Sequence, residues 1–129
     1  MAAFTDAQTD AINAQGGSVL VSAAAGSGKT TVLIERIIRM ITRRENPIDV
    51  DRLLIVTFTR AAASEMKERL AKAINSLLEN DPYNSLLLRQ RQLMYNTSIC
   101  TIDSFCGSVV REYFHILGVQ KDFRLADEN

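Results

Sequence analysis

A stretch of small residues, Ala23–Thr30, constrains the fold of this chain more than any other feature. Its sequence matches a phosphate-binding pattern, namely glycine, four free positions, glycine, lysine and serine or threonine, with Ala23 as a tolerated variant in the first place. We predict a buried strand over Ser18–Ser22 before the loop and a helix from Lys29 to about Arg43 after it. Strand, loop and helix in this order are the context that the pattern requires, and a turn of small residues with a chance lysine is the alternative.

The residue types of the loop suit an anionic ligand. Gly26 and Gly28 allow the backbone to curl so that successive N–H groups face one concavity, and the following helix adds the positive end of its dipole. We expect the Lys29 ammonium to lie between the β- and γ-phosphates of ATP and the Thr30 hydroxyl to ligate Mg²⁺, which makes these two the predicted catalytic residues. The predicted nucleotide-binding residues of the loop are Ala23, Ala24, Ala25, Gly26, Ser27, Gly28, Lys29, Thr30 and Thr31.

The remaining segments alternate between helix and strand. Leu53–Val56 and Asn96–Thr101 read as two further strands, and runs that are apolar on both faces are typical of a parallel sheet covered by helices. Helical patterns are expected over Asp6–Asn13 with a cap at Thr5 or Asp6, over Arg60–Leu78, over Leu86–Met94, and from a cap at Asp103 or Ser104 to Gly118. The sequence therefore predicts an α/β fold with a short, mostly parallel sheet flanked by helices.

Composition and charge limit the function. The chain has 129 residues, of which 47% are hydrophobic and 23% charged, and its formal net charge is zero. Zero net charge argues against a large non-specific contact with nucleic acid, so any DNA contact is expected to be local. The sequence contains no apolar run of membrane-spanning length and no visible signal peptide, so we expect a cytoplasmic protein without a membrane partner.

Cysteine and histidine are scarce. Cys100 and Cys106 are the two cysteines and His115 is the one histidine. Their spacing fits neither a metal site nor a redox pair, so a bound zinc ion is not expected. We interpret both cysteines as reduced, buried thiols that act as small apolar side chains.

Four segments in order carry a family resemblance: Phe4–Gln8, Ala23–Thr30, Val56–Met66 and Thr101–Cys106. Together they resemble superfamily-one helicases of the UvrD/Rep type, and most closely the AddA family, the helicase–nuclease subunit of the bacterial AddAB recombination machine. The tail Phe123–Asn129 also resembles that family, so the resemblance covers essentially the whole chain.

The resemblance implies both a fold and an activity. The fold would be a RecA-like P-loop domain with three layers. The full-length protein would use ATP to move 3′-to-5′ on single-stranded DNA while it processes double-strand breaks, with single- and double-stranded DNA as substrates. An AddB-like subunit would be its partner.

Individual residues acquire roles through the same resemblance. Gln8 corresponds to the glutamine that reads adenine, and an amide offers the donor and the acceptor that this base edge requires. Without the resemblance, a surface residue on a capped helix is the ordinary interpretation of Gln8. The family's DNA-contact motifs correspond to Thr57, Phe58, Thr59 and Arg60, and to Thr101, Ser104 and Phe105.

Phe58 has two interpretations. At the carboxyl end of a strand it can stack on a base, beside threonines that hold a phosphate, or it can be an ordinary core residue. Asp103 stands where many relatives have histidine, and because a carboxylate is a poor phosphate contact we do not assign it to DNA. Arg39, Arg43 and Arg44 are interpreted as a solvated helix end.

Residues 1–129 are expected to form one incomplete domain, the first part of a motor domain. The acidic motif that completes Mg²⁺ binding and the arginine fingers lie later in family members and are not found here. We therefore expect weak or no nucleotide binding and negligible hydrolysis by this chain alone. A parallel sheet without its later strands exposes an edge and apolar surface, which favours self-association.

Two other classes of function stay open. A small-molecule kinase would also carry a phosphate-binding loop, but no acceptor-binding segment or arginine-rich lid is recognisable in the sequence. A degenerate nucleotide-binding domain that only mediates contacts is the other alternative. The intact Lys29-Thr30 pair argues against degeneracy.

Overall fold

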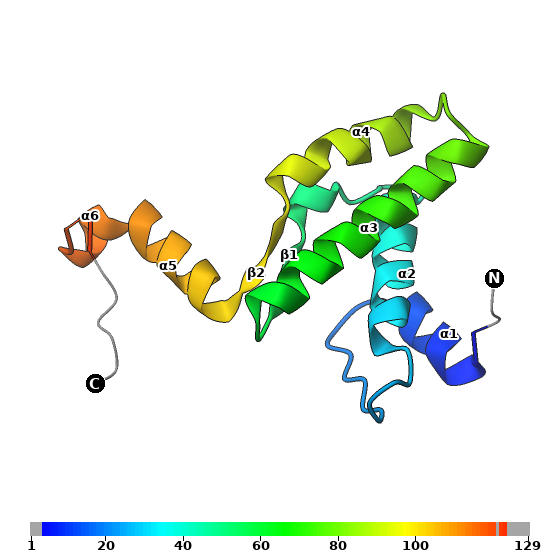
Figure 1. Cartoon of the computed structure of the whole chain (residues 1–129), viewed down its shortest axis with the longest axis horizontal. Coiled ribbons are helices and arrows are strands. Elements are labelled where there is room, and N and C mark those ends of the chain that lie inside the picture. Colours follow the sequence, from blue (N-terminus) through cyan, green and yellow to red (C-terminus); the bar gives the residue numbers. More distant parts are fainter. Residues whose placement is uncertain (1–3, 121, 124–129) are drawn as a thin grey trace.

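The computed structural model describes residues 4–120 and 122–123. The family-like tail was expected over Phe123–Asn129, and it lies outside the described residues from position 124 onward. The elements in chain order are α1 (Asp6–Asn13), α2 (Lys29–Ile41), the 3-10 helix η1 (Val50–Arg52), β1 (Leu54–Thr57), α3 (Arg60–Asn80), α4 (Ser85–Leu93), the 3-10 helix η2 (Met94–Asn96), β2 (Ser98–Thr101), α5 (Ile102–Glu112) and α6 (Phe114–Leu117). Figure 1 shows α1 to α4 gathered on one side of the two strands, with α5 and α6 leaving on the other.

The apolar core lies where α2, α3 and α4 meet. On α3 the buried positions recur every three or four residues, and on α2 Ile37, Ile38 and Ile41 share one face of the helix. The helices expected over Lys29–Arg43 and Arg60–Leu78 are thus confirmed, with Leu33 and Leu77 partly exposed at the margins of their buried faces. The buried members of the core are Ile37, Ile38 and Ile41 of α2, Val50 of η1, Leu70, Ile74 and Leu78 of α3, Leu87 of α4 and Met94 of η2.

β1 and β2 form a parallel pair, which confirms the predicted direction of the strands. The register pairs Leu54 with Ser98 and Thr57 with Thr101, so both strands end at the same edge. Side chains alternate between faces along a strand. Ile55 packs against the core, whereas Leu54 and Val56 are exposed on the opposite face. In the described residues helices therefore cover one face of the sheet, and the expected three-layer arrangement is not formed.

The predicted strand over Ser18–Ser22 is wrong. This segment lies in the long loop between α1 and α2, and its Leu20 side chain is 94% exposed. A strand is stable only where neighbouring strands satisfy its main-chain hydrogen bonds. Among the described residues β1 and β2 pair only with each other, so this apolar run has no strand beside it.

Local capping fixes the helix boundaries. Thr5 Oγ1 accepts a hydrogen bond from the Gln8 N–H while Gln8 Oε1 accepts one from the Thr5 N–H, which confirms the predicted cap of α1. The cap of α5 is Thr101 rather than Asp103 or Ser104, because the Thr101 hydroxyl at the end of β2 already accepts the Ser104 N–H. Gly118, with φ of 64°, ends α6 as predicted, but the single helix expected up to Gly118 is wrong, because it is interrupted at Tyr113 between α5 and α6.

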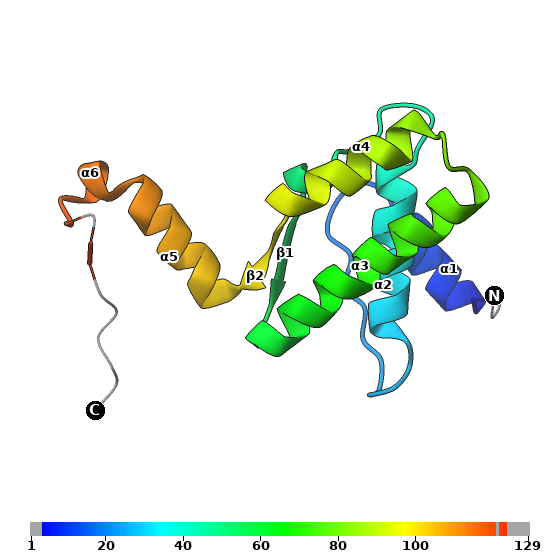
Figure 2. The same cartoon turned by 45° about the horizontal axis from the view of Figure 1, so that its top comes forward.

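α5 and α6 extend away from the core, as both views show (Figures 1 and 2). Ile102, Val109 and Tyr113 on this arm are partly exposed. Cys106 on α5 is also exposed and Cys100 on β2 is half-buried, so the expected burial of both thiols is wrong for Cys106. Among the helices of the described residues, none combines the length and the apolar character that a membrane crossing requires.

Candidate functional site

The backbone of Ala23–Thr30 curls as its glycines predict. Gly26 and Gly28 have φ of 79° and 83°, values that side chains other than glycine rarely adopt. The Lys29 ammonium turns into the loop, where it donates hydrogen bonds of 2.7 Å each to the Ala23 and Ala24 carbonyl oxygens. The loop is thus closed on its own lysine, and the cation is held beside the concave side of the backbone.

α2 begins differently from the other long helices. Side-chain oxygens of Thr5, Thr59, Asn84 and Thr101 cap α1, α3, α4 and α5. The N-cap of α2 is Gly28, and within the described residues this helix has no side-chain cap. Its first amides, near Lys29, Thr30 and Thr31, therefore have neither an intrahelical partner nor a capping oxygen, which leaves them available to an anion.

Gln8 connects α1 to the loop. Its Nε2 donates to the Ser27 carbonyl oxygen at 3.2 Å, while its Oε1 accepts from the Thr5 N–H at 2.9 Å. Both ends of the amide are thus engaged within the protein. A ligand that used the Gln8 amide would have to replace the loop contact and the capping contact together.

A cavity of about 330 Å³ lies between α1 and the loop. We call it the loop cavity; its lining includes Gln8, Ala23, Ser27 and Lys29. Its volume falls in the range of small-molecule sites. The Lys29 ammonium at its wall complements the negative charge of a nucleotide phosphate. The Gln8 amide and the uncapped start of α2 offer hydrogen-bond donors beside it. The residues present therefore fit ATP. The Thr30 hydroxyl does not line this cavity, but it is of the type that ligates Mg²⁺ beside a phosphate-binding loop.

Two arginines of α2 fix the position of α1, and sequence reasoning missed the role of both. Arg36 Nη1 donates to the Ala11 carbonyl oxygen at 2.7 Å, and Arg39 Nη1 donates to Asn13 Oδ1 at 2.7 Å. Arg39 also pairs with Glu35, and it is exposed in the last turn of α2, which agrees with its interpretation as part of a solvated helix end. These bonds hold the C-terminal end of α1, and they thereby position Gln8 against the loop.

A second cavity, of about 400 Å³, lies where β1 and β2 end. We call it the strand-end cavity; its lining includes Phe58, Arg60, Thr101, Ser104 and Arg111. Parallel pairing explains the grouping, because Thr57 and Thr101 are paired and the helices α3 and α5 both start beside them. Four of the seven predicted DNA-contact residues are thus brought together.

The other three predicted contacts do not line this cavity. Thr57 Oγ1 donates to the Thr59 carbonyl oxygen at 2.9 Å, and Thr59 Oγ1 accepts from the Ala62 N–H at 3.1 Å. Both hydroxyls therefore support the turn that carries Phe58. Phe105, in the first turns of α5, is half-buried and lies outside the set of lining residues.

Phe58 itself is 93% exposed, so its interpretation as a core residue is wrong. An aromatic side chain of this exposure at the rim of a polar cavity can offer its face to a base. Arg60 and Arg111 bring two cations to the same cavity, against the single carboxylate of Asp103. Sequence reasoning missed Arg111, although its seven-residue spacing from Ser104 along α5, two helical turns, could have indicated it.

Comparison with known proteins matches residues 4–129 to the family described as UvrD/REP helicase N-terminal domain. Similar proteins, each named as the A subunit of an ATP-dependent helicase/nuclease, occur in Anoxybacillus flavithermus and Clostridium novyi, both 54% identical over 125 residues, and in Clostridium perfringens, 52% identical over 125 residues. Each match covers 97% of this chain and 10% of the relative. The chain thus spans about a tenth of the length of these relatives.

Proposed function

Because the chain belongs to the UvrD/REP helicase N-terminal domain family, we propose that residues 1–129 form the first part of the ATP-binding motor domain of a DNA helicase. The observation that supports this most is the loop Ala23–Thr30, which holds its lysine against its own carbonyl oxygens and runs into an uncapped helix. Such an arrangement suits a polyphosphate better than any other common ligand.

In the proposed complex the phosphates of ATP replace internal contacts of the loop. Lys29 exchanges the Ala23 and Ala24 carbonyl oxygens for phosphate oxygens, which are the stronger acceptors because they are charged. Gln8 reads the adenine edge after releasing both the Ser27 carbonyl oxygen and the Thr5 N–H. Thr30 holds Mg²⁺, which when bound neutralises charge on the phosphate oxygens. Ala25, Gly26, Gly28 and Thr31 contribute main-chain amides.

Single-stranded DNA is the proposed ligand of the strand-end cavity. Phe58 would stack on a base, while Arg60 and the Ser104 hydroxyl would contact the adjoining phosphates. Thr101 would position that hydroxyl, because its own hydroxyl caps α5 and donates to Ser104 Oγ. Thr57 and Thr59 would contribute indirectly, because their hydroxyls hold the turn that carries Phe58. Phe105 would contact the strand from the first turns of α5, outside the cavity lining.

The whole-protein activity is a further part of the proposal. By analogy with relatives whose names describe an ATP-dependent helicase/nuclease, the full protein would move 3′-to-5′ on DNA during double-strand-break repair, bound to an AddB-like subunit in the cytoplasm. The exposed side chains of Leu20, Leu54 and Val56 would pack in that larger protein, or would drive this chain to associate with itself.

Hydrolysis by this chain alone should be negligible. In the described chain no carboxylate is among the residues that line the loop cavity, so no group there completes the metal site or orients a water molecule. We expect ATP to bind weakly without turnover. A turnover number of roughly 1 to 100 per second, the range typical of kinases that transfer phosphoryl groups, would contradict this part of the proposal.

Titration with fluorescent ATP and Mg²⁺ tests the loop. We expect Lys29→Ala to weaken binding by at least about tenfold, because it removes the ammonium that would pair with the phosphates. Arg44→Ala is the matched control, since it removes an exposed cation outside the loop. Equal affinities of the wild type and Lys29→Ala would overturn the proposed nucleotide site.

Titration with labelled oligothymidine tests the strand-end cavity and also separates a motor from a small-molecule kinase. Phe58→Ala should weaken binding by about tenfold, the loss expected for one stacked base. Tyr83→Ala is the control, because that side chain is equally exposed at 92% but lies in the turn before α4. Retained DNA affinity in Phe58→Ala would remove Phe58 from the interface.

A further inference from the structure

A groove between α3 and α4 is unused by the proposed function. Its volume is about 300 Å³, and its lining includes Lys67, Ile74 and Asn75 of α3, Arg91 of α4, and Met94 and Tyr95 of η2. We call it the α3–α4 groove. Ile74 and Met94 are buried and form an apolar floor, whereas the other side chains stand at its rim.

The rim of the groove carries positive charge without an internal partner. Within the described residues neither Lys67 nor Arg91 makes an ion pair or a side-chain hydrogen bond, and no carboxylate is among the lining residues. Glu68, the next residue along α3, lies about 100° further around the helix. In contrast, internal carboxylates pair with the arginines Arg39, Arg69 and Arg89. The positive charge at its rim therefore favours an anionic ligand in the groove.

The exposed ring of Tyr95 favours one kind of anion in the α3–α4 groove. Its side chain is 88% exposed at the end of the groove, so its ring is not packed in the core. An exposed ring that lines the same groove as two cations suits a nucleobase with phosphates beside it, and a free phosphate ion would not use the ring. A volume of about 300 Å³ has room for roughly one nucleotide. Stacking also requires an unpaired base, which favours a single strand over a duplex.

α3 connects this groove to the strand-end cavity. Arg60 lines that cavity, and Lys67 stands seven residues later on the same face, about 10 Å along the helix axis. We propose that the α3–α4 groove is a second binding site for single-stranded DNA, in which Tyr95 stacks on a base and Lys67 and Arg91 hold the adjoining phosphates. The proposal rests on the DNA contact proposed at the strand-end cavity, from which the strand would continue along α3.

Oligonucleotide length separates the two sites. The 129-residue chain is titrated with labelled oligothymidines of about four and about twelve nucleotides, the span of typical single-strand sites, and fluorescence anisotropy is followed. Tyr95→Ala should weaken binding of the longer strand about tenfold and leave the shorter one within about twofold. Lys67→Ala with Arg91→Ala should lower the slope of log affinity against log salt by about 1.4, since two phosphate contacts are lost.

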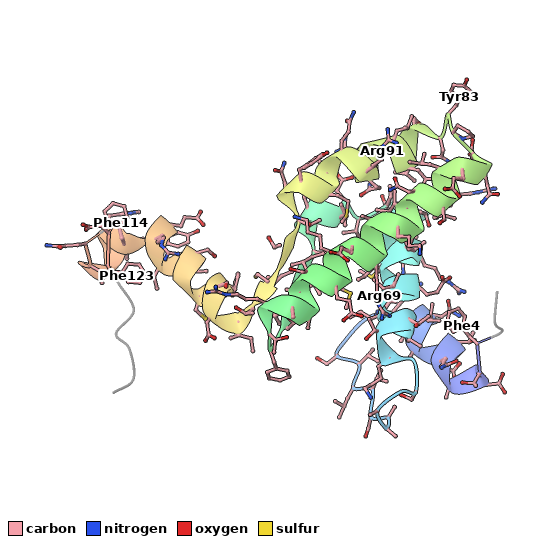
Figure 3. The ribbon with its side chains drawn as sticks, in the orientation of Figure 1. Phe4, Arg69, Tyr83, Arg91, Phe114 and Phe123 are labelled. Carbon is pink, nitrogen blue, oxygen red and sulfur yellow. The ribbon has the colours of Figure 1, made fainter. Side chains whose placement is uncertain are left out.

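Matched controls lie nearby. Tyr83→Ala removes an aromatic that is 92% exposed in the turn before α4 and is labelled with Arg91 in Figure 3. Lys72→Ala removes an exposed cation on another face of α3. Thermal melting followed by circular dichroism checks that every variant is folded. Both controls should leave the affinity for the longer strand unchanged.

The outcomes separate this inference from the proposed function. If Phe58→Ala weakens binding of both strands while the groove variants change neither, the groove is overturned and the DNA contact stands. Equal weakening by the controls also overturns the groove. A wild-type chain that binds neither strand overturns both proposals. If polyglutamate displaces the longer strand as well as an unlabelled oligothymidine of equal charge does, the groove binds acidic protein segments instead.

Discussion

The helical core and the loop between α1 and α2 are held together in opposite ways. In the core, side chains such as Leu70 and Ile41 are completely buried between α2 and α3. In the loop, Leu20 is almost fully exposed, and the contacts that define its shape are hydrogen bonds from Gln8 and Lys29 to carbonyl oxygens. Burial of apolar surface stabilises the first region, whereas a few exchangeable polar contacts shape the second.

This difference explains where binding can occur. A ligand can displace the polar contacts of the loop at little cost, because Lys29 and Gln8 regain equivalent bonds to phosphate and base. No ligand could compensate for opening the core. The two regions meet in α2, whose first turn belongs to the loop and whose later residues Ile37, Ile38 and Ile41 belong to the core.

The largest difference in stability should appear when a leucine is replaced by alanine in each of the two regions. Leu70→Ala removes a completely buried side chain, so we expect the free energy of unfolding to fall by about 3 kcal/mol. Leu20→Ala removes an exposed side chain and should change it by less than about 0.5 kcal/mol. Urea unfolding followed by circular dichroism at low protein concentration measures both. Similar losses would mean that the loop is packed in solution.

The next largest loss of stability should follow the removal of a polar group from the core. Gln90 is completely buried, and its Oε1 accepts the Val50 N–H at 2.9 Å while its Nε2 donates to Asp49 at 2.9 Å. Gln90→Leu leaves that N–H without a partner, so we expect a loss of about 2 kcal/mol in unfolding free energy. Gln92→Leu, at an exposed position of the same helix, is the control. An unchanged urea midpoint for Gln90→Leu would show that the bond contributes little.

Sequence periodicity predicted the helices well because the pattern that marks a helix is local to one segment. The helices α2 and α3 and the caps at Thr5 and Gly118 follow from spacing within one segment, and the parallel direction of β1 and β2 follows from the helical segments between them. The loop motif at Ala23–Thr30 was equally readable, since positive φ at Gly26 and Gly28 depends on glycine itself.

The predictions that were wrong concern features that depend on partners far away in the sequence. Ser18–Ser22 has the composition of a strand, yet a strand forms only beside another one, and composition does not say whether that neighbour is available. For the same reason Phe58 and Cys106 are exposed rather than buried. The hydrogen bond from Arg36 that holds α1 also could not be predicted from the sequence, because it joins residues 25 positions apart.

Alanine substitutions of one glycine in the loop and one glycine in a helix should change the stability by smaller amounts and in opposite directions. Gly28→Ala places a side chain at φ of 83°, which costs about 1 kcal/mol. Gly107→Ala, inside α5, should instead stabilise the helix by up to about 1 kcal/mol, provided that the flexible end of Arg111, which lies 3.4 Å from the added carbon, moves aside. Urea unfolding gives the sign of each change. The Gly28 variant should also bind ATP more weakly, and unaltered binding would show that the loop tolerates other conformations.

The smallest expected effect is a pH dependence of the stability to urea. It comes from Asp49, which is hydrogen-bonded to the buried Gln90 of the core. Hydrogen bonds from Arg89 and Gln90 lower the pKa of Asp49 to about 2. Because this pKa lies below that of an unfolded aspartate, near 3.9, the stabilisation is complete above about pH 4 and is lost as the pH falls toward 2. Asp49→Asn should flatten this decline in the urea midpoint. Asp6→Asn, at the exposed start of α1, should leave it unchanged, since Asp6 takes part in no ion pair within the described residues. A decline of equal size in wild type and Asp49→Asn would assign the acid sensitivity to other carboxylates and would remove this pair from the forces that hold α4 to the core.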